Sequence, residues 1–322
     1  MPENASSSFR WVPGEGPESD AVRRMADAFP KPKKTMGEAW FMGDRRVFPE
    51  LLGNLDELKN EQIWEPLEEI ASGPGCFGQH EEWTGWYHYL LPRLIRRDWR
   101  STYDPAGLLI ACFVAQHPNS DGPWPYPKFR SDALATLGRH PMSANFWPDG
   151  RVDIERCLHK YETADGTRGW YNCGGSLSAS LFFCVKYLPE EHVATWFESV
   201  IAINDPFWIA QVIVWLIGAH PLLMSADVQP ASFPELGSYG VRWDWSHALR
   251  GNYSGEFEEP VVRVPFLPKA NSEALLAVAR NWNVEGFFKR LLADPQLDSV
   301  AAETAGLPDR FLALYRQDSQ QA

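Results

Sequence analysis

Acidic residues concentrate in the stretch from Glu50 to Glu82, which holds nine carboxylates and a single basic residue, Lys59. Four of the carboxylates recur at the spacing of one helical face: Glu61, Glu65, Glu68 and Glu69. Like charges one helical turn apart destabilise an isolated helix by about 0.2–0.5 kcal/mol per pair. A cationic partner would offset this repulsion. We therefore expect this face to bind a basic protein. A solvated outer face has the same pattern, and the arginines between positions 93 and 100 are an internal source of counter-charge.

A second candidate is Cys173, in a glycine-rich segment over 169–176 that leads into a predicted helix. A helix N-terminus lowers the pKa of a thiol, so Cys173 could act as a nucleophile with His159 or His192 as its base. The alternative is a turn in which the glycines adopt positive φ, and we favour it because no known catalytic motif surrounds the cysteine.

Metal and cofactor sites are not expected. Cys157, His159 and Cys173 lack the paired short spacing of zinc ligands. No phosphate-binding or dinucleotide-binding glycine pattern occurs in the sequence. The runs His80-Glu81-Glu82 and Arg242–His247 bring polar residues together along the chain, but neither matches a metal or triad motif.

The chain contains 15 tryptophans, several of them beside acidic residues or histidine. Aromatic rings with two carboxylates can line a glycan-binding cleft, so an enzyme of the (α/α) type is the alternative function. Tryptophan at helical spacing is more often part of a core, and Trp83 and Trp86 fit that interpretation.

Apolar residues recur at the helical period in many places, which predicts amphipathic helices. The stripes are Val22, Met25, Ala26 and Phe29; Phe48, Leu51, Leu52 and Leu55; Ile154, Cys157, Leu158 and Tyr161; and Val193, Trp196, Phe197, Val200 and Ile201. Helix starts are marked by an aspartate before a proline, because the carboxylate caps free amides and proline loses no hydrogen bond there. These starts are Asp104-Pro105, Asp205-Pro206 and Asp294-Pro295.

Three successive helices are predicted over 176–188, 190–203 and 207–219. The third is apolar on nearly all sides, so it should be a central core helix. We expect Pro221 to end it, which would leave it too short to span a bilayer. Short connections between the three favour antiparallel packing, as in HEAT-type repeats.

The sequence thus predicts an all-α fold: an antiparallel helical array, HEAT-like or an irregular bundle, with at most a minor β element near 261–264. We expect a flexible N-terminal segment over 1–17, one helical domain over 18–317 with room for a sub-boundary near 230, and a flexible tail over 318–322. The first 19 residues are polar and lack the apolar run of a signal peptide.

Net charge and cysteine content disfavour further classes of protein. The net charge of −12 disfavours nucleic-acid binding. Five irregularly spaced cysteines do not suggest a disulfide framework, which favours the reducing cytoplasm. We expect a cytoplasmic, non-catalytic protein-binding scaffold with no membrane association. One version is an acidic immunity-type protein that neutralises a basic partner.

Overall fold

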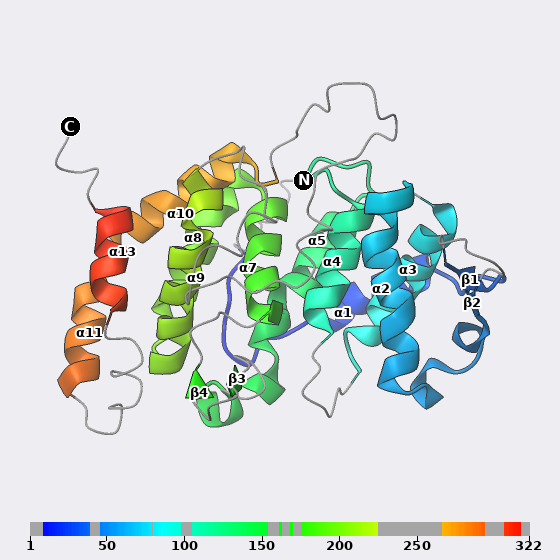
Figure 1. Cartoon of the computed structure of the whole chain (residues 1–322), viewed down its shortest axis with the longest axis horizontal. Coiled ribbons are helices and arrows are strands. Elements are labelled where there is room, and N and C mark those ends of the chain that lie inside the picture. Colours follow the sequence, from blue (N-terminus) through cyan, green and yellow to red (C-terminus); the bar gives the residue numbers. More distant parts are fainter. Residues whose placement is uncertain are drawn as a thin grey trace, which may run out of the picture.

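The computed structural model describes residues 9–38, 46–78, 80–97, 105–153, 161–162, 168–169, 175–224, 266–293 and 306–316. Most of this part is helical. The α-helices are α1 (Ser19–Ala28), α2 (Asn60–Phe77), α3 (Glu81–Leu94), α4 (Ala106–Gln116), α5 (Phe129–Thr136), α7 (Gly175–Tyr187), α8 (Glu190–Ala202), α9 (Pro206–Met224), α10 (Lys269–Asn281), α11 (Val284–Ala293) and α13 (Leu307–Tyr315). They lie side by side along the long axis, with α1–α5 at one end and α10–α13 at the other (Figure 1).

In the described residues, the β-strands form two short antiparallel ladders. β1 (Met36–Gly37) pairs with β2 (Val47–Phe48), and β3 (Tyr161–Glu162) pairs with β4 (Arg168–Gly169). The protein therefore has the predicted all-α fold with a minor β element. The strand expected at 261–264 lies outside the described residues.

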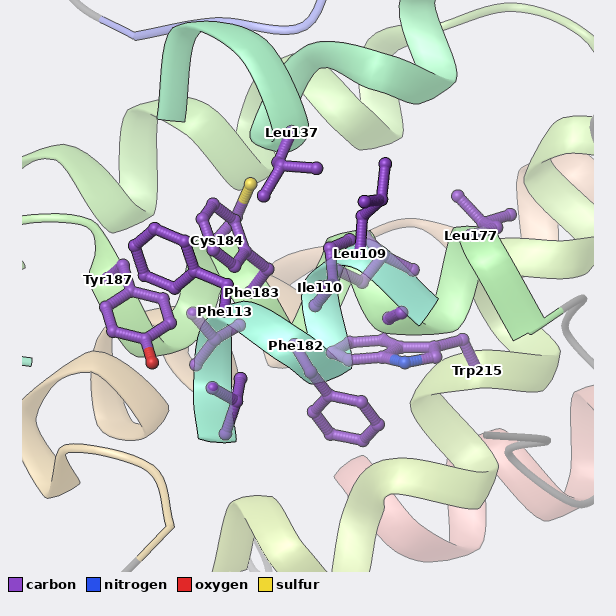
Figure 2. Packing of buried hydrophobic residues seen from close by; sticks show 14 of the residues in the cluster. Leu109, Ile110, Phe113, Leu137, Leu177, Phe182, Phe183, Cys184, Tyr187 and Trp215 are labelled. Carbon is purple, nitrogen blue, oxygen red and sulfur yellow. The ribbon is translucent and has the colours of Figure 1, made fainter. Parts of the chain in front are cut away.

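The centre of the array is an apolar core in which α4 packs between α2 and α7. Every residue of α4 is buried, so this helix has no polar face. Figure 2 shows Phe113 of α4 beside Phe183 and Tyr187 of α7, with Trp215 of α9 against Phe182. Burial of such rings is the main favourable contribution to folding, at roughly 25 cal/mol per Å² of apolar surface.

The helix α9 is the central buried helix that the sequence predicts, but it is longer than expected. It continues through Pro221 to Met224. Proline removes one backbone donor, yet Leu222 and Leu223 are buried beyond it, and their packing accounts for the extra turn. The prediction that this helix is too short to cross a bilayer is therefore wrong. Its 19 residues have a mean hydropathy of 1.7 in the most apolar window, but 78% of that window is buried within the protein, as in a core helix.

Asp205 caps α9 as predicted from the Asp-Pro pair. Its Oδ1 accepts hydrogen bonds from the backbone amides of Phe207 (3.0 Å) and Trp208 (3.1 Å). Its Oδ2 accepts a third from the amide of Val152, at 3.2 Å. The other two Asp-Pro pairs, at 104–105 and 294–295, include residues outside the described ones.

Two predicted stripes do not form the expected helices. The stripe over 48–55 becomes a strand residue and two 3-10 helices, Pro49–Leu52 and Leu55–Glu57, and Leu52 is 40% exposed. Gly53 and Asn54 interrupt the helical period there, and Asn54 caps the second short helix. In the stripe over 154–161, Tyr161 lies in β3, and residues 154–160 lie outside the described ones.

The N-terminal segment also differs from expectation, because the part from Phe9 onward is packed against the core. Trp11 is 2% exposed, and its indole Nε1 donates to the carbonyl of Gly138 at 2.7 Å. Its backbone amide donates to Oγ of Ser199 at 2.9 Å. A large ring with a satisfied N–H favours burial, and this anchors a polar segment that has no helical stripe.

Candidate functional site

The acidic face is formed by α2 with the geometry that the sequence predicts. Ile63, Leu67 and Ile70 are fully buried and hold the helix against the core. On the opposite side, Glu61 and Glu65 are exposed, while Glu68 and Glu69 are half-buried. The apolar stripe therefore fixes the direction in which the carboxylates point. We call Glu61, Glu65, Glu68 and Glu69 the acidic face.

Part of the charge on this face is neutralised by a residue that the sequence did not single out. Arg46 forms an ion pair with Glu65 and a second one, at 3.3 Å, with Glu38. Two arginines of the cluster that was expected to supply counter-charge bond backbone carbonyls. Arg93 donates to the carbonyl of Tyr89 at 2.7 Å, and Arg97 donates to that of Leu55 at 2.7 Å. Arg46 lies before the acidic stretch and is not part of any sequence motif, so its ion pair with Glu65 could not be predicted from the sequence.

A tryptophan lies within the acidic face. Trp64 is half-buried, and its Nε1 donates to Oε1 of Glu68 at 2.8 Å. This hydrogen bond holds the indole among the carboxylates. Asn60, Glu61, Trp64 and Glu65 line a cavity of about 310 Å³. An ammonium or guanidinium group is attracted both to the face of an indole and to carboxylates, so the cavity has the chemistry of a site for a lysine or arginine side chain.

The cysteine site cannot be assembled from the described residues. Cys173 and His159 both lie outside them, as does the run over 242–247. Cys112 and Cys184 are described, and both are free and buried. Burial raises the pKa of each thiol well above its ordinary value, so neither is a nucleophile at neutral pH. Within the described ranges, no group of three potential metal-binding side chains comes together.

The tryptophans at helical spacing are core residues, as their pattern indicates. Trp83 and Trp86 of α3 are at most 1% exposed. Their indole Nε1 atoms donate to the carbonyls of Gly37 and Lys34, each at 3.2 Å. They therefore line no glycan cleft. His80 and Glu82 of the nearby polar run also have local roles: the His80 ring packs on Trp83, and Glu82 accepts a hydrogen bond from the amide of Gly37.

A pair of histidines forms a second candidate site that sequence reasoning missed. His88 of α3 and His117, directly after α4, approach with their Nε2 atoms 2.9 Å apart. The ring centroids are 5.1 Å apart and the ring planes differ by only 14°. The two imidazoles thus lie almost in one plane, end to end, and share an N–H···N hydrogen bond. The two histidines are 29 residues apart in a sequence that carries no motif around either of them.

Aromatic rings enclose this pair. Phe29 stacks on His88 with centroids 4.4 Å apart. Phe113, Trp124 and Phe129 contact His117 at centroid distances of 5.0, 5.6 and 5.0 Å. We call these six residues the histidine cluster. His88 is 7% exposed and His117 is 9% exposed, so both imidazoles are largely withdrawn from water.

Burial keeps both imidazoles neutral. It lowers the pKa of His88 from 6.5 to about 4. It lowers that of His117 from 6.5 to about 3, and the neighbouring His88 adds to this shift. A neutral pair needs opposite tautomers, because one Nε2 must carry the hydrogen that the other accepts.

No match was found among protein-family models, curated proteins or solved structures. The acidic face and the histidine cluster are therefore the features of the molecule that indicate a function.

Proposed function

We propose that this protein is a non-catalytic scaffold of the cytoplasm that binds a basic protein through the acidic face of α2. The observation that carries the proposal is the cavity of about 310 Å³ where Trp64 lies beside the carboxylates of Glu61 and Glu65. Tryptophan is enriched among residues that dominate binding energy, and carboxylates around it add selectivity for a cation. An acidic protein that neutralises a basic one, as an immunity protein does, is the specific version of this proposal.

The shape of the site supports a protein partner. The carboxylates at Glu61 and Glu65 are exposed and follow one helical face, so they can meet a row of positive charges. Their long-range attraction would speed the encounter, while the indole of Trp64 would contribute contact area after docking.

The test compares two double variants with the same change in net charge. E61K/E65K reverses the cavity carboxylates and leaves the Glu68–Trp64 hydrogen bond in place. D27K/E198K reverses exposed acids on α1 and α8 as the matched control. A basic partner is first isolated from the source cell with the wild-type protein, and its association rate is then measured for each variant against ionic strength.

We expect E61K/E65K to slow association at low salt by at least about tenfold relative to D27K/E198K, because local charge complementarity governs the encounter. The difference should shrink as salt shortens the screening length. Equal rates for the two variants at low salt would show that only total charge matters, and the proposed site would be rejected.

A glycan-acting enzyme is the second candidate, since Trp64 with the carboxylates of Glu61 and Glu65 also suits a sugar ring. The two candidates differ in their response to salt. A neutral oligosaccharide should bind with the same affinity at low and high ionic strength, whereas a lysine-rich peptide should bind less tightly at high salt. Hydrolysis of a glycan that is lost in E61Q or E65Q would establish the enzyme in place of the scaffold.

A further inference from the structure

The His88–His117 pair can take up one additional proton and keep its hydrogen bond, but a second proton breaks that bond. In the neutral pair one Nε2 donates and the other accepts across 2.9 Å. A first proton from solvent can bind the Nδ1 of the donor ring, which keeps the bond and makes it charge-assisted. A second proton places hydrogen on both Nε2 atoms, which then face each other as two donors, and the two positive rings repel.

Other titratable groups around the cluster do not replace the histidines in this role. Tyr87 of α3 and Tyr187 of α7 are buried, which raises their pKa values well above the ordinary one, and Tyr187 donates to the backbone carbonyl of His117 at 2.6 Å. Burial also raises the pKa of Tyr126. From α5, Asp132 is engaged by Arg24 of α1 and by the hydroxyl of Tyr126 at 2.9 Å. The tyrosines thus stay neutral in acid, and Asp132 already has its counter-charge.

One segment of the chain, residues 118–128 between α4 and α5, depends on this cluster for its position. Its side chains alternate between exposed and half-buried from Asp121 to Pro127, and the inward ones include Trp124 and Tyr126. Trp124 packs on His117, Phe113, Phe129 and Tyr187. The segment also has hydrogen bonds to α5: the hydroxyl of Tyr126 donates to Asp132 at 2.9 Å, and Arg130 donates to the carbonyl of Ser120 at 3.2 Å. A surface segment with so few anchors opens at lower free energy than the helices beneath it.

We propose that the His88–His117 pair is an acid-sensitive latch that holds segment 118–128 closed when it carries at most one extra proton and releases it when both imidazoles are protonated. Release separates the rings, frees Trp124, and exposes the aromatic surface of Phe113 and Phe129. The proton uptake occurs from solvent, and no other reactant is needed.

The latch responds in mildly acidic solution, above the pH at which the closed pair itself titrates. In the open segment both imidazoles regain water and their ordinary pKa of 6.5, compared with about 4 and about 3 when closed. Between these limits, each proton taken up on opening multiplies the opening constant about tenfold per pH unit. Two protons therefore raise it about a hundredfold per pH unit as the pH falls below 6.5.

The experiment measures this slope by amide hydrogen exchange, corrected for intrinsic rates, between pH 6 and 4.5. The reporters are the amides of His117 and Phe129, which donate to the carbonyls of Phe113 (2.8 Å) and Tyr126 (3.0 Å) at the two ends of the segment. The amide of Ile209 in α9, which donates to the carbonyl of Asp205 at 2.9 Å, reports global unfolding.

We expect the opening constant at Phe129 to rise about a hundredfold per pH unit in the wild type, about tenfold in H88Q, and to be constant in H88Q/H117Q, since glutamine cannot be protonated. H192Q, which removes a histidine of α8, should behave as the wild type. Should H88Q fail to fold, H117Q makes the same comparison, and the wild-type slope stands as a test by itself.

Two results would overturn the latch. One is a wild-type slope of tenfold per pH unit or less. The other is equal opening constants at Phe129 and Ile209 throughout, which would mean that acid unfolds the whole protein and releases no separate segment.

Discussion

The two histidines of the histidine cluster and the aromatic residues packed on α9 are all buried, but their polar atoms have different kinds of partner. Around α9, Trp208 contacts Trp11 and Trp147, and Trp215 contacts Phe182. We call these five residues the α9 core. Three of its indole N–H groups donate to backbone carbonyls, from Trp11 to Gly138, from Trp147 to Pro141 and from Trp208 to Val200, at 2.7, 2.8 and 3.0 Å.

In the histidine cluster, two imidazole nitrogens bond each other. Indole does not gain or lose a proton in ordinary solution, whereas imidazole does so near neutral pH. Two clusters of similar size and aromatic content should therefore respond to different variables: the α9 core to changes of volume, and the histidine cluster to pH.

Acidification should have the largest effect and should act through the histidine cluster. Both folded pKa values lie below 6.5, so stability is fully present above pH 6.5 and is lost as the pH falls toward about 4. The loss is about 1.4 kcal/mol per pH unit for each histidine, or about 5 kcal/mol for both between pH 6.5 and 4.5. Urea unfolding of wild type and H88Q/H117Q at these two pH values measures it. Parallel pH dependence of the two proteins would contradict this assignment.

Trp215→Ala should have the next largest effect and should not depend on pH. Trp215 is 0% exposed, so truncation leaves a cavity in the core and should cost about 3–5 kcal/mol. The same loss is expected at pH 7 and at pH 5.5. A loss below about 1 kcal/mol would place the side chain in a site that refills on truncation, and a loss that grows in acid would remove the contrast between the clusters.

Asp205→Ala should cost about 1 kcal/mol, because it removes the cap that fixes the start of α9 and thus the position of Trp208. Thermal unfolding of D205A and of D205N measures the effect. Asparagine keeps an acceptor oxygen at the cap, so D205N should retain most of the stability. Equal losses of stability in D205A and D205N would show that the negative charge of Asp205, and not its acceptor oxygen, stabilises the start of α9.

The smallest effect distinguishes a paired indole from an unpaired one within the α9 core. Trp208 donates to the carbonyl of Val200 at 3.0 Å, whereas the buried Nε1 of Trp215 has no hydrogen-bond partner among the described residues. Phenylalanine removes a similar volume at both positions. W208F should therefore be less stable than W215F by about 1 kcal/mol, since it leaves the Val200 carbonyl unpaired. A larger loss in W215F would show that its N–H has a partner in solution.

The α9 core and the histidine cluster also differ in how far the sequence predicts them. The three helices α7, α8 and α9 were predicted within a few residues at most ends, because their periodicity and the Asp205 cap are local signals. The extension of α9 past Pro221 was missed, since it depends on packing of Leu222 and Leu223 against the rest of the fold. The shared helical face of Glu61, Glu65, Glu68 and Glu69 on α2 was also predicted from their spacing.

The histidine pair could not be predicted in this way. His88 lies on an apolar helix and His117 follows another, where each alone is an ordinary buried histidine. Their contact requires the packing of α3 on α4, which has no signature in a single sequence. The ion pair of Arg46 with Glu65 could not be predicted for the same reason, because Arg46 precedes β2 and Glu65 lies in α2.

The position of Trp11 has a consequence for how the chain is completed during synthesis. Its amide bonds to Ser199, which is 188 residues further along the chain. At translation rates of about 5–20 residues per second, a ribosome needs roughly 10–40 s to make that stretch, so the N-terminal tryptophan waits outside the tunnel for its partners. We expect this segment to be open to proteases and chaperones in stalled nascent chains from which Ser199 has not yet emerged, and to become protected once it has. The segment around Trp11 is thus synthesised before its partner Ser199 and can complete its docking on the core only after Ser199 has been made.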